Sequence, residues 1–278
     1  MKRFPAACIG VSVSSFLLNP IFSFSSCSAK ADVTRFSTFH PCNVVRSNTL
    51  QALQGLGHSK EDAEIITDVL MFAELRGNNQ GLIKLVSGGL NKNVDDKDIN
   101  RLMESPVSCK IDGGQRIGMV VVSHATSIAI EKAKKSGIAV VGCSNYASAT
   151  GALGYWARQI TDAGLIGIVM SQCNEMVAPH GSYEPIFGTN PIAIGIPTLP
   201  RPQILDMATS ASAYYGIKMA ESMGVTIAND IAYDCNGLET IDPSAALKGA
   251  IRVFDRSFKG SHLALMVELL AGVKEIVN

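Results

Sequence analysis

The chain has 278 residues, a length that accommodates one or two domains. Apolar residues make up 47% of it and charged residues 17%, which provides a sizeable core and excludes an intrinsically disordered chain. Lys plus Arg and Asp plus Glu both total 24, so the net charge is zero. Proteins that bind nucleic acid or an anionic membrane surface carry a basic excess, so we expect neither as a main partner.

The first thirty-one residues have the composition of a targeting segment. Two basic residues precede an apolar, serine-rich stretch at 6–24, and no acidic residue occurs before Asp32. Ala29-Lys30-Ala31 has the small-x-small form of a signal-peptidase site, but the same composition also describes an organelle transit peptide. We expect residues 1–31 to be a presequence or a disordered tail, and the mature chain to have no membrane span. The compartment stays open between an organelle (plastid or mitochondrion), the secretory route and the cytoplasm.

The cysteines give little support to a secreted or metal-binding protein. There are seven, widely spaced, with no Cys-x-x-Cys pair and no Cys/His cluster at zinc spacing. This pattern predicts neither a disulfide framework nor a metal site, and it suits a reducing compartment.

The region from residue 41 to residue 105 has the pattern of a helical domain. Residues 50–56 continue an amphipathic helix. Ser59, followed by acidic residues in the next turn, is typical of the N-cap of a second helix, which we expect to end near Gly77. Residues 82–90 predict a third helix.

From residue 106 onward, short β-branched segments alternate with helical periods. Strands are expected at 108–111, 138–141, 165–170, 192–196 and 204–207, and helices at 118–135, 152–163, 211–223 and 262–270. The alternation predicts an α/β domain over 106–260, followed by a C-terminal helix within 261–278. The glycine-rich GxGxxG and GxxxxGK[ST] fingerprints of nucleotide sites do not occur.

Eight short stretches resemble the malate/L-lactate dehydrogenase type 2 family of NAD(P)-dependent 2-oxoacid reductases. In chain order they are Ala73-Glu74-Leu75-Arg76-Gly77, Ser144-Asn145, Ala163-Gly164-Leu165-Ile166-Gly167-Ile168-Val169, Ala178-Pro179-His180-Gly181, Gly188-Thr189-Asn190-Pro191-Ile192-Ala193, Leu205-Asp206-Met207-Ala208-Thr209-Ser210, Phe258-Lys259-Gly260 and Ala264-Leu265-Met266-Val267-Glu268-Leu269-Leu270-Ala271-Gly272. One such match alone would be weak, whereas eight in order and at matching spacing identify the family.

The resemblance implies a fold and an activity. The fold is a helical domain joined by the C-terminal part of the chain, plus an α/β domain with a mixed, largely antiparallel sheet that binds the dinucleotide without a Rossmann fold. The activity is hydride transfer between NAD or NADP and a small 2-oxo or 2-hydroxy acid, in a homodimer. Malate, lactate, a sulfonated analogue and ureidoglycolate all fit the family, so the substrate and the choice of cofactor stay open.

The resemblance also implies which residues contact the dinucleotide. They are Ser144, Asn145, Asp206, Met207, Ala208, Thr209, Lys259 and Gly260. We expect a helix to begin near residue 209, where free N–H groups could bind a phosphate, and the charge of Lys259 beside a glycine suits a pyrophosphate. An ordinary capped helix and a solvated loop lysine are the alternatives.

The catalytic positions depart from the family. Gln80 and Tyr146 stand where the resemblance places two histidines, and glutamine cannot donate a proton as an acid. Tyr146 is therefore the candidate proton donor, with Asp206 in support, although an ordinary tyrosine pKa of about 10 suits the task only after tuning. Lys84 stands where the family has an arginine that grips the substrate carboxylate, and Asn190 is a second candidate for substrate contact.

Two hypotheses follow from these observations. The first is a 2-oxoacid reductase with a substituted proton-transfer group. The second is a catalytically inactive or truncated relative that binds dinucleotide or a partner without turnover. The family continues past residue 272 for several tens of residues, so we expect apolar faces of the N-terminal helices to be exposed here.

Overall fold

The computed structural model describes residues 7–10 and 40–272. The helices are α1 (Cys42–Gly55), α2 (Lys60–Glu74), α3 (Ile83–Val86), α4 (Gly118–Ser136), α5 (Leu153–Asp162), α6 (Tyr214–Met223), α7 (Pro243–Ala246) and α8 (Phe258–Gly272). The strands are β1 (Ala7–Gly10), β2 (Asn100–Glu104), β3 (Ser108–Asp112), β4 (Ile138–Ser144), β5 (Ile166–Met170), β6 (Val177–Ala178), β7 (Ile192–Ile196), β8 (Gln203–Met207), β9 (Ala232–Tyr233) and β10 (Ala250–Arg252). Every strand expected from the sequence is present.

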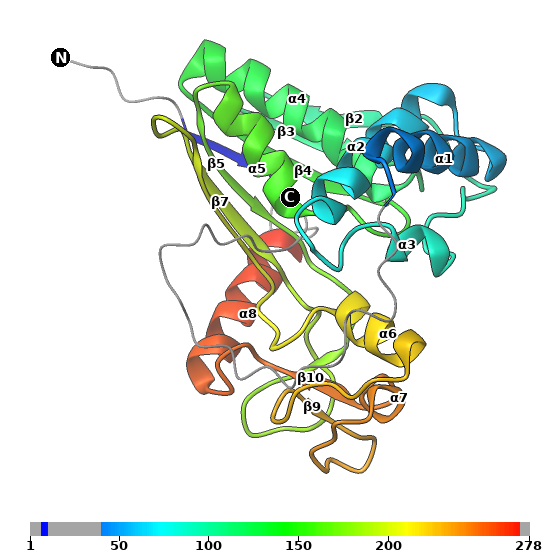
Figure 1. The fold of residues 1–278 in the computed structure, drawn as a ribbon. Helices are drawn as coiled ribbons and strands as arrows, with labels where there is room; N and C mark the ends of the chain where they lie inside the picture. Colours follow the sequence, from blue (N-terminus) through cyan, green and yellow to red (C-terminus); the bar gives the residue numbers. More distant parts are fainter. Residues whose placement is uncertain (1–6, 11–39, 273–278) are drawn as a thin grey trace.

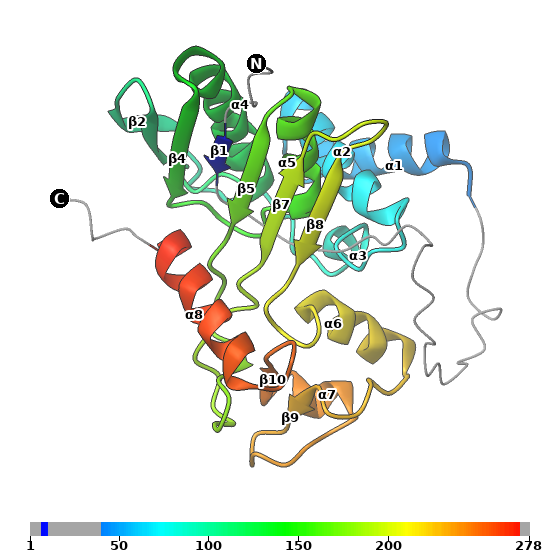
Figure 2. The ribbon, with the colours of Figure 1, turned by 90° about the vertical axis from the view of Figure 1, so that its left-hand side faces the viewer.

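The larger sheet has seven strands in the order β2-β3-β4-β1-β5-β7-β8 (Figure 2). Neighbours run parallel from β3 through β4 and β1 to β5, and antiparallel for β2-β3, β5-β7 and β7-β8. The sheet is mixed, as expected, but its six pairings divide evenly and are not mainly antiparallel. Two of the three parallel pairings arise because β1 lies between β4 and β5.

Strand β1 falls within residues 1–31, for which a presequence or a disordered tail is predicted. The rest of that stretch lies outside the described residues, as do residues 273–278 of the predicted C-terminal segment. The predicted domain boundaries and the compartment stay predictions.

Helices cover one face of this sheet in two layers (Figure 1). Helix α4 packs on β3, β4 and β1, and α5 packs on β5, β7 and β8. Helix α2 lies on α4 and α5, and α1 lies on α2. The core between these layers contains Trp156, Ile111 and Leu70, all fully buried.

Local signals explain where the first helices begin and end. Ser59 caps α2 by accepting a hydrogen bond from the Asp62 N–H at 3.1 Å, as the sequence predicts. Asp62 also pairs with Arg116 at the start of α4, which ties the two helices together. The third helix is shorter than the expected 82–90, because only Ile83–Val86 is α-helical and the chain then turns at Gly88, whose φ is 73°.

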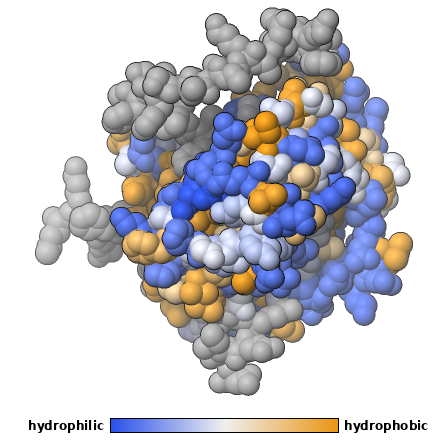
Figure 3. Space-filling view, turned by 90° about the horizontal axis from the view of Figure 1, so that it is seen from below, coloured by the Kyte–Doolittle hydropathy of each residue, from blue (hydrophilic) through white to orange (hydrophobic). Residues whose placement is uncertain are grey.

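A smaller sheet, in the order β6-β10-β9, forms the other end of the molecule with α6 and α7. It has a separate core that includes Ile217 of α6, Val177 of β6 and Ile251 of β10. Seen from this end, the surface is mainly hydrophilic with scattered apolar residues (Figure 3). Among the described residues in this view, apolar side chains are scattered between hydrophilic ones.

The second face of the larger sheet lies opposite α4 and α5 and is open in Figure 2. Ile138 and Val140 of β4, Ile196 of β7 and Leu205 of β8 are 40–47% exposed. The sequence also predicts exposed apolar faces on the N-terminal helices. In α2, Ile66 and Leu70 are fully buried, whereas Val44 of α1 is 43% exposed and Val86 of α3 is 83% exposed. In the described part of the chain, exposed apolar side chains therefore occur both on the N-terminal helices and on the open face of the sheet.

Gly151 joins α2 to α5 through a close approach that only glycine allows. Its φ is 81°, and a Cβ there would lie 2.1 Å from Cγ1 of Val69. We expect Gly151→Ala to lower the free energy of unfolding by about 3 kcal/mol, because the clash adds to the left-handed strain. Gly137→Ala is the control: φ is 87° there but no atom lies within 4 Å, so we expect a loss of about 1 kcal/mol. Urea unfolding measures both, and equal losses would show that the Val69 contact contributes nothing.

Candidate active site

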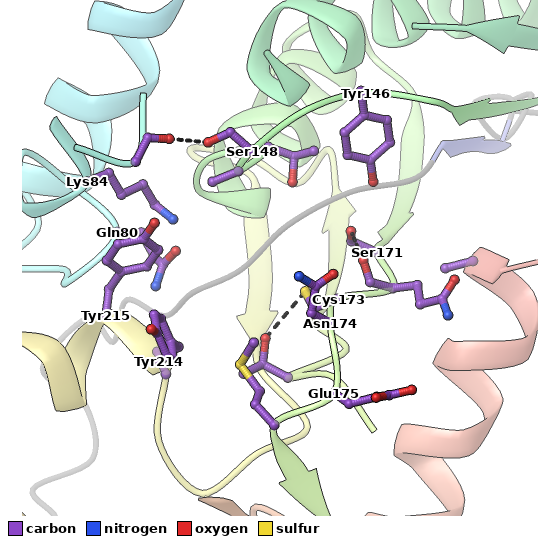
Figure 4. Close-up of a pocket in the computed structure, with 18 of the residues that line it drawn as sticks. Gln80, Lys84, Tyr146, Ser148, Ser171, Cys173, Asn174, Glu175, Tyr214 and Tyr215 are labelled. Atoms are coloured by element: carbon purple, nitrogen blue, oxygen red, sulfur yellow. Dashed lines mark hydrogen bonds between the residues drawn. The ribbon is translucent and has the colours of Figure 1, made fainter. Parts of the chain in front are cut away.

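A cleft of about 1300 Å³ opens beyond the carboxyl ends of β4 and β5, between α3 and α6 on one side and α8 on the other (Figure 4). Crevices at the carboxyl ends of parallel strands are the usual ligand sites of open α/β sheets. Among the residues that line it are Gln80, Lys84, Ser144, Asn145, Tyr146, Ser148, Cys173, Glu175, Thr189, Tyr215 and Glu268.

Lys84 is the one cation among the described residues that line this cleft. Its side chain extends from α3 and is 2% exposed, and its Nζ lies 4.0 Å from the ring centroid of Tyr215 on α6. A cation over an aromatic face is stabilised by the ring quadrupole, which partly offsets the loss of hydration. Figure 4 shows the amine pointing into the cleft beside Gln80.

Burial governs the charge of this amine. Desolvation lowers the pKa of Lys84 to about 7. The same burial raises the pKa of Cys173, so that its thiol stays neutral near pH 7. Lys84 is therefore balanced between its charged and neutral forms at neutral pH, and an anion entering the cleft would favour the charged form.

Tyr146 comes from the loop after β4 and lies across the cleft from Lys84. Its hydroxyl points toward the side on which Ser171 lies (Figure 4). Two glycines leave room for it: a Cβ at Gly113 would lie 3.0 Å from the Tyr146 Cβ, and one at Gly118 would lie 3.0 Å from its Cδ2. The tyrosine is thus held against the start of α4 and is only partly exposed.

Ser144 ends β4, and Asn145 follows it at the rim of the same cleft. Asn145 has a φ of 57°, and its amide donates to the Asp112 carboxylate at 2.6 Å. Its backbone carbonyl accepts from the Gln115 N–H at 2.8 Å. These hydrogen bonds fix the turn that carries Tyr146. Asn145 therefore positions this loop, in addition to any contact with the dinucleotide.

Gln80 occupies the wall next to Lys84 and is 4% exposed. Its backbone N–H donates to the Asn78 side chain at 2.9 Å, and its amide lies 3.4 Å from the Asn79 side-chain oxygen. A buried amide in this place can donate or accept a hydrogen bond but cannot supply a proton.

The sequence profile of the malate/L-lactate dehydrogenase family matches residues 41–274. The chain belongs to the malate/L-lactate dehydrogenase family. L-sulfolactate dehydrogenase of Methanothermobacter thermautotrophicus is 36% identical over 227 residues, which are 80% of this chain and 66% of that protein. Malate dehydrogenase of Pyrococcus abyssi is 35% identical over 248 residues, 84% of this chain and 67% of that protein.

The fold comparison agrees with the sequence comparison. The crystal structure of malate dehydrogenase from Entamoeba histolytica superimposes with a TM-score of 0.78 at 28% identity, covering 87% of this chain and 72% of that one. The chain spans about two thirds of the length of the curated relatives it matches. The relatives are dehydrogenases, so the family places this chain among the oxidoreductases.

The family resemblance predicted a second group of site residues, and the structure places these outside the cleft. Asn190, Asp206, Met207, Ala208, Thr209, Lys259 and Gly260 are not among the described residues that line it. Several of them instead form hydrogen bonds that hold other parts of the protein in place.

Asn190 connects three segments of the chain. It is fully buried, and its amide donates to the Ala264 carbonyl at 3.2 Å and to the Glu268 carboxylate, both on α8. Its side-chain oxygen accepts from the Cys173 N–H at 3.3 Å. The residue therefore holds α8 against the cleft wall.

Thr209 and Ser210 do not begin a helix, which corrects the sequence expectation. Helix α6 starts only at Tyr214, because Thr209 donates its hydroxyl to the carbonyls of Thr189 and Asn190, and Ser210 pairs with Val253 as in a strand. The expected phosphate-binding helix N-terminus is absent at residue 209.

Lys259 and Gly260 lie within the first turn of α8 and not before it. Lys259 is exposed, and the N–H of Gly260 donates to the Asp255 carboxylate at 3.1 Å. A Cβ at Gly260 would lie 2.2 Å from that carboxylate oxygen, so the glycine is required for this contact. The Asp255 carboxylate thus caps the start of α8.

Asp206 caps α5 from the neighbouring strand. Helix α5 has no side-chain cap of its own, and the N–H of Gly154 donates to the buried Asp206 carboxylate at 2.6 Å. A carboxylate at a helix N-terminus is also favoured by the helix dipole.

We expect Asp206→Ala to lower the free energy of unfolding by about 2 kcal/mol, because it leaves the buried Gly154 N–H without its acceptor. Asp206→Asn keeps an acceptor and is expected to lose about half as much. Thermal unfolding measures both variants. If Asp206→Asn leaves the unfolding temperature unchanged and abolishes turnover, the residue acts in catalysis and not as a cap.

Sequence reasoning missed Tyr215, whose ring lies under the Lys84 amine, and Cys173, which lines the same cleft. Neither belongs to a short motif, and their place in the cleft depends on how α6 and the loop after β5 pack. No group of three or more metal-ligating side chains occurs in residues 7–10 and 40–272. Over the same ranges no helix is long and apolar enough to cross a membrane.

Proposed function

We propose that this chain reduces a small 2-oxo acid with NAD(P)H, as a malate/lactate dehydrogenase-like oxidoreductase. The observation that carries the proposal is Lys84, a buried cation that faces the cleft without a carboxylate partner among the described residues. A carboxylate beside the amine would complete the pair, because a buried charge is stable only when matched. The family and the dehydrogenase relatives supply the reaction class.

Bound NAD(P)H would supply the hydride, and the chain's residues would supply binding and the proton. Lys84 would hold the substrate carboxylate, and Tyr146, on the far wall, would donate a proton to the oxygen of the reduced carbonyl. Gln80 could donate a hydrogen bond to the same oxygen but no proton. Asn190 would influence substrate binding only indirectly, because it holds α8 against the cleft wall.

The cofactor residues fit the cleft in part. Ser144 and Asn145 line it and could contact the nicotinamide half. The hydroxyl of Thr209 and the carboxylate of Asp206 already bond to the protein, and Lys259 and Gly260 belong to a self-capped helix turn. Their contact with NAD or NADP, and that of Met207 and Ala208, stays a proposal drawn from the family alone.

We further propose a homodimer, and targeting to an organelle or to the secretory route by the N-terminal segment. The exposed aliphatic side chains on the open sheet face support association, because apolar patches of this kind are usually covered. The acid-free, serine-rich composition of residues 1–31 supports targeting.

The test uses the full chain and follows oxidation of NADH and of NADPH with oxaloacetate and with pyruvate. In parallel, the emission of Trp156 reports on binding, since its indole donates to the Thr150 carbonyl at 3.0 Å and Thr150 lines the cleft. Saturable quenching with turnover supports the proposal and identifies the preferred cofactor. A folded chain that shows neither overturns it.

A second candidate is an inactive relative that binds dinucleotide without turnover. The glutamine at residue 80 favours it, because that buried amide replaces a family histidine and cannot supply a proton. Quenching of Trp156 without oxidation of either cofactor would select this alternative.

A further inference from the structure

Lys84 is a buried amine that faces open volume. Its side chain is 2% exposed, and its Nζ lies over the Tyr215 ring at 4.0 Å. No residue in the described part of the chain accepts a hydrogen bond from this amine or forms an ion pair with it. The protein therefore holds a primary amine at the edge of a cleft of about 1300 Å³, and within the described part of the chain no hydrogen bond or ion pair occupies that amine.

The surroundings favour the neutral, nucleophilic form of the amine. Burial lowers the pKa of Lys84 to about 7, whereas an exposed lysine titrates at about 10.4. Burial raises the pKa of three groups that share the cleft with it, Cys143, Cys173 and Tyr215, and so keeps them neutral. The other titratable groups among the described lining residues are Tyr146, Tyr214, Glu175 and Glu268. Glu268 is bonded to Gln172 and Asn190, so it is not a counter-ion for Lys84.

We propose that Lys84 is a covalent carbonyl-binding site, whose amine condenses reversibly with small aldehydes and 2-oxo acids that enter the cleft. Nζ attacks the carbonyl carbon, and a C–N bond forms. The carbonyl oxygen then leaves as water together with the two amine protons, which gives an imine. The step consumes no oxidant or reductant. Desolvated lysines in other proteins react in this way with carbonyl compounds.

This site is specific to a lysine. The arginine that the family resemblance places at this position would bind a carboxylate as well or better, but a guanidinium stays protonated and does not form an imine. The inference uses the same cleft as the proposed reductase and deepens it, but it does not depend on turnover. The charged form of Lys84 would bind a carboxylate and the neutral form a carbonyl, so the two roles are separated by protonation.

The test treats the full chain with glyoxylate and sodium cyanoborohydride at pH 7, which reduces any imine to a stable secondary amine. Peptide mapping by mass spectrometry then compares Lys84 with Lys248, an exposed lysine between the lining residues Leu247 and Gly249. We expect at least about ten-fold more modification at Lys84, because burial increases the neutral fraction of that amine. The comparison is made on the wild-type chain, so it does not depend on how a variant folds.

Variants add a matched control. Lys84→Arg should abolish the fast phase of glyoxylate incorporation, and Lys248→Met should leave it unchanged. Labelling of Lys84 no faster than that of Lys248 would overturn the inference, as would undiminished fast incorporation in Lys84→Arg. Fast labelling of Lys84 in a chain that never oxidises NADH or NADPH would support this site and reject the proposed reductase.

Discussion

Lys84→Met is expected to raise the KM for a 2-oxo acid by about 100-fold while the protein becomes more stable. The substitution keeps the length of the side chain and removes the one cation among the described lining residues of the cleft. A charge-assisted hydrogen bond to a carboxylate in a desolvated site contributes about 2–3 kcal/mol, which corresponds to this change in affinity. Steady-state oxidation of the preferred dinucleotide measures KM, with Lys248→Met as the matched surface control.

The stability half of this prediction follows from proton linkage. The pKa of Lys84 is about 7 in the folded protein and near its ordinary value of 10.5 in the unfolded chain. Between these values the unfolded chain binds more protons, so this group makes wild-type stability rise with pH, by up to about 1.4 kcal/mol per unit. Lys84→Met should be the more stable form at pH 7 and should lack this rise from pH 7 to pH 10. Urea unfolding at several pH values measures both effects.

The pH profile of kcat/KM distinguishes the charge of Lys84 from the shape of its side chain. Because only the protonated amine holds a carboxylate, wild-type kcat/KM should fall above about pH 7. Cys173 and Tyr215 have raised pKa values and do not titrate there. Lys84→Arg should carry its charge to higher pH and remove the fall. An unchanged KM in Lys84→Met, or an unshifted profile in Lys84→Arg, would exclude a carboxylate role for this residue.

Local patterns predicted most of the secondary structure because local forces decide it. Ser59 and the acidic first turn mark the start of α2, and β-branched runs mark β4, β5 and β7. The error at residue 209 has a tertiary cause, since the Thr189 carbonyl and the strand-like pairing of Ser210 hold that segment extended. Helical periodicity over 211–223 carried no information about those partners.

The cleft was predictable only in part. The resemblance pointed to Lys84, Gln80 and Tyr146, and the structure brings all three to one cleft although they come from two separate regions of the chain. It also pointed to Asp206 and Lys259, which share short motifs with the family but face a helix end and solvent here. A motif preserves the backbone path, whereas the direction and partners of a side chain depend on neighbours that the motif does not contain.

Tyr146→Phe is expected to lower kcat by about 10²–10³-fold and to leave KM within a few-fold. The change removes only the hydroxyl, and the ring would keep its place between Gly113 and Gly118. General acid catalysis contributes about 10²–10⁴-fold, and Gln80 cannot replace it. Single-turnover reduction followed by the loss of dinucleotide absorbance measures the step, with the unfolding temperature as a check on folding.

Tyr215→Phe is the matched control for the loss of a hydroxyl in the same cleft. It keeps the ring beneath the Lys84 amine and so should change kcat by less than about three-fold. A large fall of kcat in both variants would mean that the loss of any hydroxyl from this cleft disturbs its shape, and that Tyr146 has no special role as an acid. A normal kcat in Tyr146→Phe would mean that the proton comes from solvent. In that case the chain would use Lys84 to hold the substrate and the dinucleotide for the hydride, with no tyrosine acid in the reaction.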